Sequence, residues 1–150
     1  MPKEKYLKNR DISMVEKDMQ RLFGKHLEKF PPLRSEVYEL KFTKHTSLPF
    51  DSVKEHQIKG LKQAEEKGIY HKIQDMPWGT TDKFRFTLKK PFDCFFVRAT
   101  AFVVIWYYVP RATKRFIKIG IEDFLKEKEV SERKSLTMER AMAIGKIVYI

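Results

Sequence analysis

Residues 37–43, with the sequence Val-Tyr-Glu-Leu-Lys-Phe-Thr, decide how this chain folds. Apolar and charged side chains alternate along them, and a β-strand sends successive side chains to opposite faces of its sheet. Tyr38, Leu40 and Phe42 therefore share the face that enters a core, while Glu39 and Lys41 lie side by side on the other face. A carboxylate beside an ammonium group can hold a divalent metal and stabilise charge on a phosphate. The same pair also describes an ordinary salt bridge on a solvated strand, so its surroundings decide its meaning.

The composition indicates a globular domain that contacts polyanions. The 150 residues are 42% hydrophobic and 13% aromatic, which is too apolar for a disordered tail. The net charge of +11 favours nucleic acid as a partner first and an acidic membrane surface second, although a basic protein can simply be soluble. Cys94 is the only cysteine, which excludes a disulfide framework and a cysteine-rich zinc site. With no apolar run long enough to span a bilayer and no secretory signal in residues 1–5, we expect a cytoplasmic protein without a membrane partner.

Hydrophobic periodicity predicts an α/β fold with a mixed sheet flanked by helices. A first helix is expected from Ser13 to Phe30, ended by two prolines, and a second from a cap at Asp51 or Ser52 to Gly68. The most apolar strand, Ala101–Val109, is expected at the centre of the sheet. Further strands are expected around residues 69–73, 84–88, 92–97 and 116–118, and further helices over 121–128 and 137–144. We expect a single domain over residues 1–150, with 1–12 as a flexible arm and 129–150 as a charged linker and helix.

Three other features are candidates for chemistry. Asp93 stands among phenylalanines at the start of an apolar strand, where it is either a buried carboxylate that needs a partner or metal, or an exposed residue at a turn. Gln57 falls on the apolar stripe of its helix, where it either makes a satisfied core contact or faces a cleft. Acidic and amide side chains on the first helix, Glu16, Gln20 and Glu28, could orient a metal-bound water or simply be solvated. His26, His45 and His71 lack metal-ligand spacing, and the sequence has no glycine-rich phosphate loop.

These residues together resemble the PD-(D/E)XK nucleases, and within them most closely the Holliday junction resolvases of bacteria and their phages. The resemblance covers most of residues 13–135 and is carried by the strand Glu39-x-Lys41, then Leu48-Pro49-Phe50, then the helix residues Glu55-His56-Gln57. In that family the metal-binding Asp precedes the Glu-x-Lys strand. Here no Asp lies between Pro32 and Glu39, and Pro91-Phe92-Asp93 resembles the same element placed later in the chain, as in a permuted fold.

The resemblance implies a restriction-endonuclease-like fold and a Mg²⁺-dependent endonuclease, with Mn²⁺ as a substitute, that cuts branched DNA in recombination or replication as a homodimer. A phage-encoded enzyme would act in the host cytoplasm. By the same resemblance Asp93 and Glu39, with Gln20 or Glu16, would hold the metal, Lys41 would position the attacking water, and Gln57 would orient Lys41 or that water. The residues expected to contact DNA phosphates are Lys44, Lys54, His56, Lys89, Lys90, Arg111, Lys114 and Arg115.

Two other interpretations stay open. Basic residues interleaved with aromatics are also typical of a nucleic-acid-binding module that performs no chemistry. A structural protein whose basic surface meets acidic partners is the third possibility. Within the nuclease interpretation, the shape of the DNA substrate is not specified, because the same catalytic residues serve many substrate classes.

Overall fold

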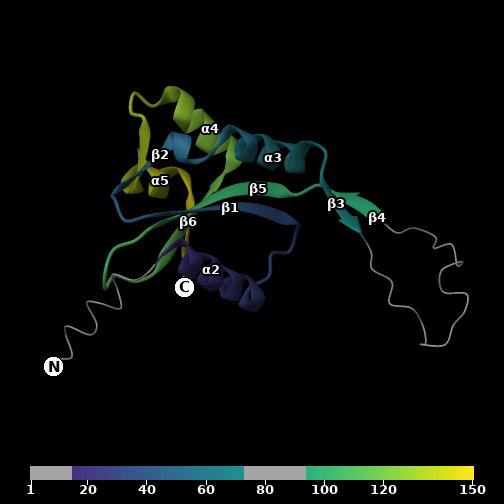
Figure 1. Cartoon of the computed structure of the whole chain (residues 1–150), viewed down its shortest axis with the longest axis horizontal. Helices are drawn as coiled ribbons and strands as arrows, with labels where there is room; N and C mark the ends of the chain where they lie inside the picture. Colours follow the sequence, from purple (N-terminus) through teal and green to yellow (C-terminus); the bar gives the residue numbers. More distant parts are fainter. Residues whose placement is uncertain (1–14, 73–93) are drawn as a thin grey trace, which may run out of the picture.

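The computed structural model describes residues 15–72 and 94–150, and a four-stranded mixed sheet runs through them (Figure 1). The strand order is β1-β5-β6-β8. β1 (Glu36–Thr43) runs parallel to β5 (Thr100–Tyr107), which pairs antiparallel with β6 (Arg115–Gly120), and β6 pairs antiparallel with β8 (Lys146–Tyr149). The mixed sheet flanked by helices in one domain is confirmed.

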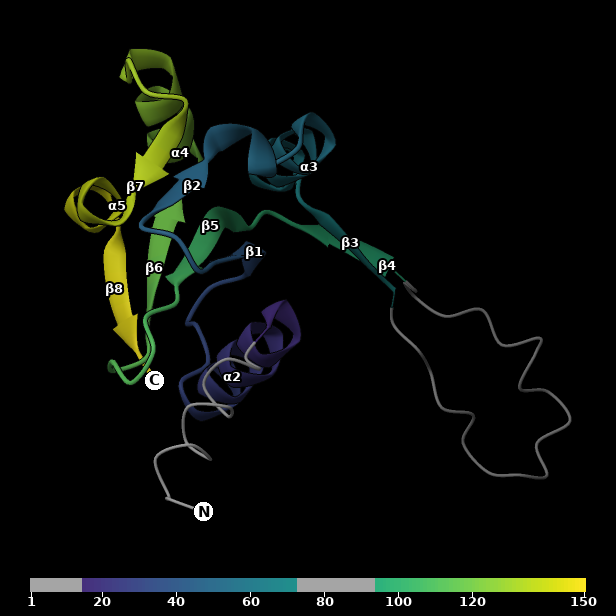
Figure 2. The same cartoon turned by 60° about the vertical axis from the view of Figure 1, so that its left-hand side comes forward.

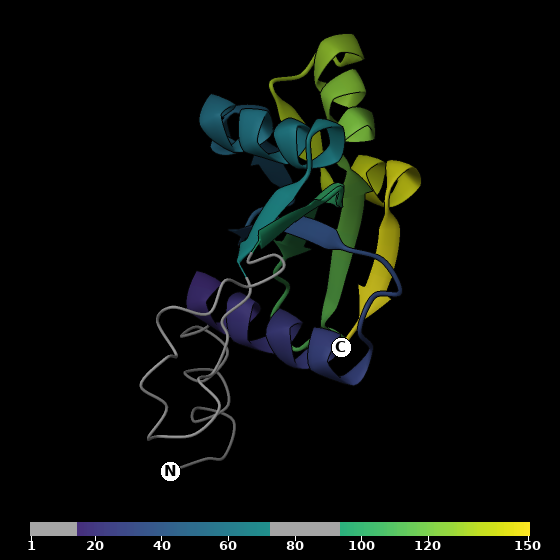
Figure 3. The ribbon, with the colours of Figure 1, turned by 90° about the vertical axis from the view of Figure 1, so that its right-hand side faces the viewer.

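The helices cover the two faces of the sheet unequally. Of the described helices, α2 (Glu16–Lys29) lies on one face, whereas α3 (Glu55–Glu66), α4 (Ile121–Val130) and α5 (Met138–Ile144) lie on the other (Figures 1 and 3). Among the described helices none is long and apolar enough to cross a membrane.

Two short ribbons complete the described part. β2 (Ser47–Pro49) pairs antiparallel with β7 (Ser135–Thr137), and a 3₁₀ turn, η1 (Phe50–Ser52), follows β2 directly. β3 (Ile69–Lys72) pairs antiparallel with β4 (Cys94–Val97), and this ribbon projects away from the end of the sheet (Figure 2).

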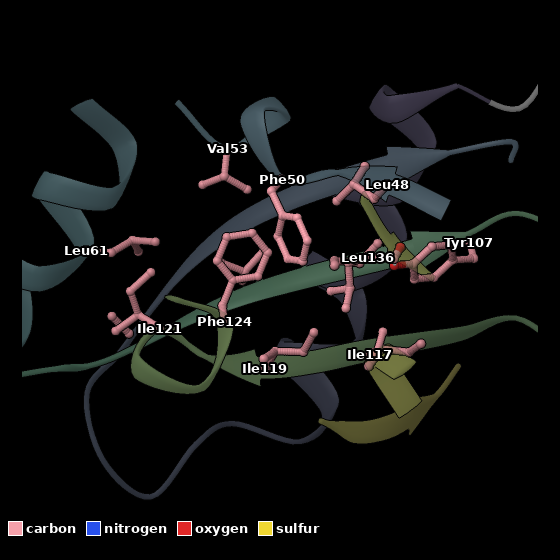
Figure 4. Packing of buried hydrophobic residues seen from close by; sticks show 14 residues of the cluster. Leu48, Phe50, Val53, Leu61, Tyr107, Ile117, Ile119, Ile121, Phe124 and Leu136 are labelled. Carbon is pink, nitrogen blue, oxygen red and sulfur yellow. The ribbon is translucent and has the colours of Figure 1, made fainter. Parts of the chain in front are cut away.

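The sheet separates two cores, and the apolar residues that alternate along β1 face one of them. Toward α2, Tyr38 and Phe42 pack with a cluster that includes Met19 and Phe23 of the helix and Trp106 of β5. Toward α3, α4 and α5, the larger core contains the residues of Figure 4, among them Phe50, Leu61, Ile117 and Phe124. β5 faces both cores and is buried throughout residues 103–107, so its expected central position is confirmed.

Several expected boundaries need correction. α3 begins at Glu55 and not directly after Asp51 or Ser52, because residues 50–52 form the separate 3₁₀ turn and Lys54 is the N-cap. The expected linker 129–150 is more than a linker and a helix, since it contributes β7 and adds β8 to the main sheet. The Ser13 cap, the arm 1–12 and the strand expected over 84–88 lie outside the described residues. Gly68 follows α3 with a φ of 97°, so the expected glycine stop is confirmed.

Candidate active site

Glu39, Lys41 and Gln57 form one hydrogen-bonded group on the α3 side of the sheet. Gln57 Nε2 donates to Glu39 Oε1 over 2.7 Å, and Lys41 Nζ donates to Gln57 Oε1 over 3.1 Å. Lys41 Nζ also lies 3.0 Å from Glu39 Oε1, which closes a triangle of contacts. The strand supplies two members at alternate positions and the helix supplies the third, as their parity and stripe position predict.

The start of α3 explains why the Gln57 amide has a defined orientation. The backbone N–H of Lys54 donates to Gln57 Oε1 over 2.8 Å, so the side chain of Gln57 caps the first turn of its own helix. A Gln three residues after the N-cap can accept from the N-cap N–H as in a capping box, although the N-cap here is Lys54 and not the Ser or Thr of that motif. Gln57 Oε1 therefore accepts from both a backbone N–H and Lys41, while its amide nitrogen is left for Glu39.

The group is half-buried and borders a hollow. The side chains of Lys41 and Glu39 are 16% and 24% exposed. Glu39 and Gln57 line a shallow hollow of about 490 Å³ together with Gly60 of α3 and Ile69 and Tyr70 of β3. Among the described strands, β1 lies at the edge of the four-stranded sheet, and the hollow lies beside it.

The donor set fits a hard cation held jointly with a substrate. Among the described residues, Gln57 and Lys41 both contact Oε1 of the Glu39 carboxylate. Mg²⁺ is usually held by one or two protein carboxylates, with waters and substrate phosphates as its other ligands. Within residues 15–72 and 94–150, no group of three or more His, Cys, Asp and Glu side chains is placed to hold a metal.

Four other predicted positions are not part of this group. Asp93, the expected second carboxylate, and the expected phosphate contacts Lys89 and Lys90 lie outside the described residues. Gln20, the expected third metal ligand, is exposed on α2, which packs against the opposite face of the sheet from Glu39 and Lys41. The structure therefore does not bring Gln20 to the Glu39 group.

The two other candidate metal ligands on the first helix lie on the same side of the sheet as Gln20. Glu16 and Glu28 are also exposed on α2. That helix buries Met19 and Phe23 against the Tyr38 face of β1, so its polar side chains point away from the sheet. The expected metal ligand on the first helix is therefore corrected, because the sheet lies between α2 and the Glu39 group.

The expected basic contacts lie around the site and beyond it. Lys54 and His56 are exposed at the start of α3, and Lys44 is exposed directly after β1. The other three, Arg111, Lys114 and Arg115, lie at the turn between β5 and β6 and the start of β6. β1 and β5 are parallel and Thr43 pairs with Tyr107. Lys44 and this turn therefore lie at the same end of the sheet, beyond the carboxyl ends of both strands.

A second polar group on β1 was not anticipated. The Glu36 carboxylate accepts hydrogen bonds from the hydroxyl of Tyr38 and from Lys118 Nζ, on the α2 side of the sheet. Burial acts to raise the pKa of Glu36, but those hydrogen bonds and the charges of Lys118 and Lys146 outweigh it and lower the pKa below 4.5. Burial and the Glu36 carboxylate together raise the pKa of Tyr38. Lys118 also lies 4.1 Å from the ring centroid of Phe102.

Comparisons with protein-family models, with curated proteins and with solved structures find no match to this chain.

Proposed function

We propose that this protein is a Mg²⁺-dependent endonuclease that hydrolyses phosphodiester bonds in branched DNA, with the four-way Holliday junction as its substrate and a restriction-endonuclease-like arrangement of its sheet. The observation that carries the proposal is the contact triangle of Glu39, Lys41 and Gln57, in which residues 18 and 16 positions apart meet and two of the three, Glu39 and Gln57, line a hollow.

Each member of the triangle has a distinct task in this proposal. Glu39 would hold Mg²⁺ together with a substrate phosphate, and Asp93 is the proposed second carboxylate. The metal would lower the pKa of a bound water and stabilise the charge that develops on the phosphate. Lys41 would position the attacking water and stabilise the same developing charge. Gln57 would keep Lys41 and Glu39 in place, because its amide contacts both.

The surrounding charge supports a polyanionic substrate. The chain carries a net charge of +11, and Lys44, Lys54 and His56 are exposed within a few residues of the triangle. Lysine side chains such as those of Lys44 and Lys54 neutralise phosphates, and binding then weakens steeply as salt is added. Two symmetric cuts in a junction need two sites, so the proposed active form is a homodimer.

The proposal is tested by incubating the protein with Mg²⁺ and end-labelled DNA of five shapes: four-way junction, fork, flap, nicked duplex and linear duplex. We expect paired cuts in the junction strands, cutting with Mn²⁺ as well, and no cutting in EDTA. Absence of cutting of every DNA shape with either metal would refute the endonuclease. Cutting of another shape in preference to the junction would keep the chemistry and refute the substrate.

A non-catalytic nucleic-acid-binding protein is the second candidate, favoured by the basic and aromatic residues at the β5–β6 turn. It predicts DNA binding without a requirement for metal and without any cut product. Cleavage that is lost in Glu39→Ala and Lys41→Ala while binding is kept would exclude it.

A further inference from the structure

A second hollow, separate from the Glu39 site, lies at the turn between β5 and β6. It has a volume of about 370 Å³ and is lined by Arg111, Lys114 and Arg115, by the aromatic residues Trp106, Tyr107, Tyr108 and Tyr149, and by Val109, Ala112 and Thr113. No Asp or Glu side chain is among these lining residues. Arg111 is exposed, while Lys114 and Arg115 are half-buried. Three cations around one concave, partly aromatic wall form a site suited to an anion attached to a flat ring system.

The backbone conformation of Arg111 is an independent indication that its side chain is functional. The N–H of Ala112 donates to the carbonyl of Val109 over 3.3 Å, and Arg111 has a φ of 64°. With Pro110 before it, this is the geometry of a type II turn, whose third position favours Gly or Asn because other residues are strained at positive φ. Arg111 is the one non-glycine residue with positive φ in the described part of the chain. Arg111 therefore has a backbone conformation that is strained for arginine, and this strain indicates that its side chain is needed beside the hollow.

The register of the sheet places this hollow relative to the proposed catalytic group. Glu39 pairs with Val103, and the hollow reaches β5 at Trp106 and Tyr107. Four residues along a strand correspond to about 13 Å, and nucleotides of one DNA strand rise about 3.4 Å each. A strand whose scissile phosphate lies at Glu39 would therefore bring a phosphate roughly four nucleotides away to this turn.

We propose that the β5–β6 hollow binds a single phosphodiester of the bound DNA strand, with Arg111, Lys114 and Arg115 around the phosphate and Tyr149 against the sugar or base. This inference rests on the proposed function for the identity of the DNA and extends it by a binding site outside the catalytic group. Tyr149 is 62% exposed and pairs with Arg115 across β6 and β8, so its ring is available beside the cations.

The test measures binding alone, so that cleavage does not enter. A fluorescent four-way junction is titrated with the full-length protein in EDTA, and the anisotropy is recorded across a series of salt concentrations. The variants are Arg111→Gly and Lys114→Gln, with Lys126→Gln as the matched control, because Lys126 is an exposed cation on α4 outside the hollow.

We expect Arg111→Gly to weaken binding about tenfold at 0.1 M salt and to reduce the slope of log K against log salt by about 0.9, the value of one lost phosphate contact. Lys114→Gln should act in the same direction, while Lys126→Gln should stay within about twofold of wild type. Because glycine relieves the strained φ, the melting temperature of Arg111→Gly should equal or exceed that of the wild type, so lost binding cannot be attributed to misfolding.

The outcomes separate the two proposals. Wild-type affinity and salt slope in both Arg111→Gly and Lys114→Gln would overturn the phosphate site, whatever the cleavage assay gives. Weakened binding in both variants, in a protein that cuts no DNA, would uphold the phosphate site and refute the nuclease. An equal loss of binding in Lys126→Gln would also overturn the phosphate site, because the loss would then follow from the change in net charge alone.

Discussion

Lys41 Nζ lies 3.0 Å from Glu39 Oε1, across one face of β1 and two residues along it. An exposed ion pair of this kind contributes little to stability, about 0–1 kcal/mol. Here both side chains are mostly buried and both contact the amide of Gln57. That arrangement holds a carboxylate and an ammonium group in a defined geometry before any substrate arrives, which is what positioning in a hydrolytic site requires.

Gln57 tests whether this positioning matters. Gln57→Ala removes the amide that contacts Lys41 and Glu39, and we expect the cleavage rate to fall by about 10- to 100-fold with Mg²⁺ dependence kept, as for residues that orient metal ligands. The measurement is the single-turnover rate on the preferred DNA.

A residue on the opposite side of the same helix provides the control for that variant. Glu66 is exposed at the end of α3 and lies about 180° around the helix from Gln57, so Glu66→Ala should cut at a rate within about twofold of wild type. An unchanged rate in Gln57→Ala would remove Gln57 from the proposed site and leave its role as a helix cap.

Alanine substitutions at two glycines test the backbone conformation, because an added Cβ would be crowded at one position and free of contacts at the other. Gly68 has a φ of 97°, and an added Cβ would lie 2.8 Å from the backbone carbonyl of Val97, so Gly68→Ala should lower the free energy of unfolding by about 2 kcal/mol or more. An added Cβ at Gly24, inside α2, meets nothing within 4 Å, so Gly24→Ala should raise it by about 1 kcal/mol. Urea denaturation of both variants measures these values, and equal effects of the two would contradict the described turn at Gly68.

Glu36 predicts how stability depends on pH. Its pKa in the folded state is lowered below 4.5 because Lys118, Tyr38 and Lys146 outweigh the effect of burial. A lowered folded-state pKa contributes stability above the unfolded value, and this contribution is lost as pH falls through the folded-state pKa. Glu36→Gln should therefore be less stable than wild type at pH 7, by about 1 kcal/mol, and the difference should shrink below pH 4.5.

Urea denaturation of wild type and Glu36→Gln at a series of pH values measures that difference. Asp51→Asn is the control, since Asp51 is an exposed carboxylate paired with Lys128 on the other side of the sheet. A gap between wild type and Glu36→Gln that is constant from pH 7 to below pH 4 would contradict the lowered pKa.

Features that depend on neighbouring residues could be predicted from the sequence, whereas pairings between distant segments could not. The alternation in β1 and the stripe that contains Gln57 each follow from a few neighbouring residues, and the structure joins them. The pairing of Ser47–Pro49 with Ser135–Thr137 and the contact of Glu36 with Lys118 depend on segments more than 80 residues apart, so no local period indicates them. The first helix was expected at the metal because its polar face is visible in sequence, whereas the face of the sheet that a helix covers is not.

The most direct test of the proposed active site compares wild type with Glu39→Gln, which keeps the shape of the side chain and removes its charge. Each protein is bound to the four-way junction in EDTA, and an excess of Mg²⁺ then starts a single turnover. We predict that wild type cuts and that Glu39→Gln binds the junction equally but cuts at least about 10³-fold more slowly, because the carboxylate that holds the metal is gone. Equal cutting rates for the two proteins would contradict the claim that Glu39 is the centre of a hydrolytic site.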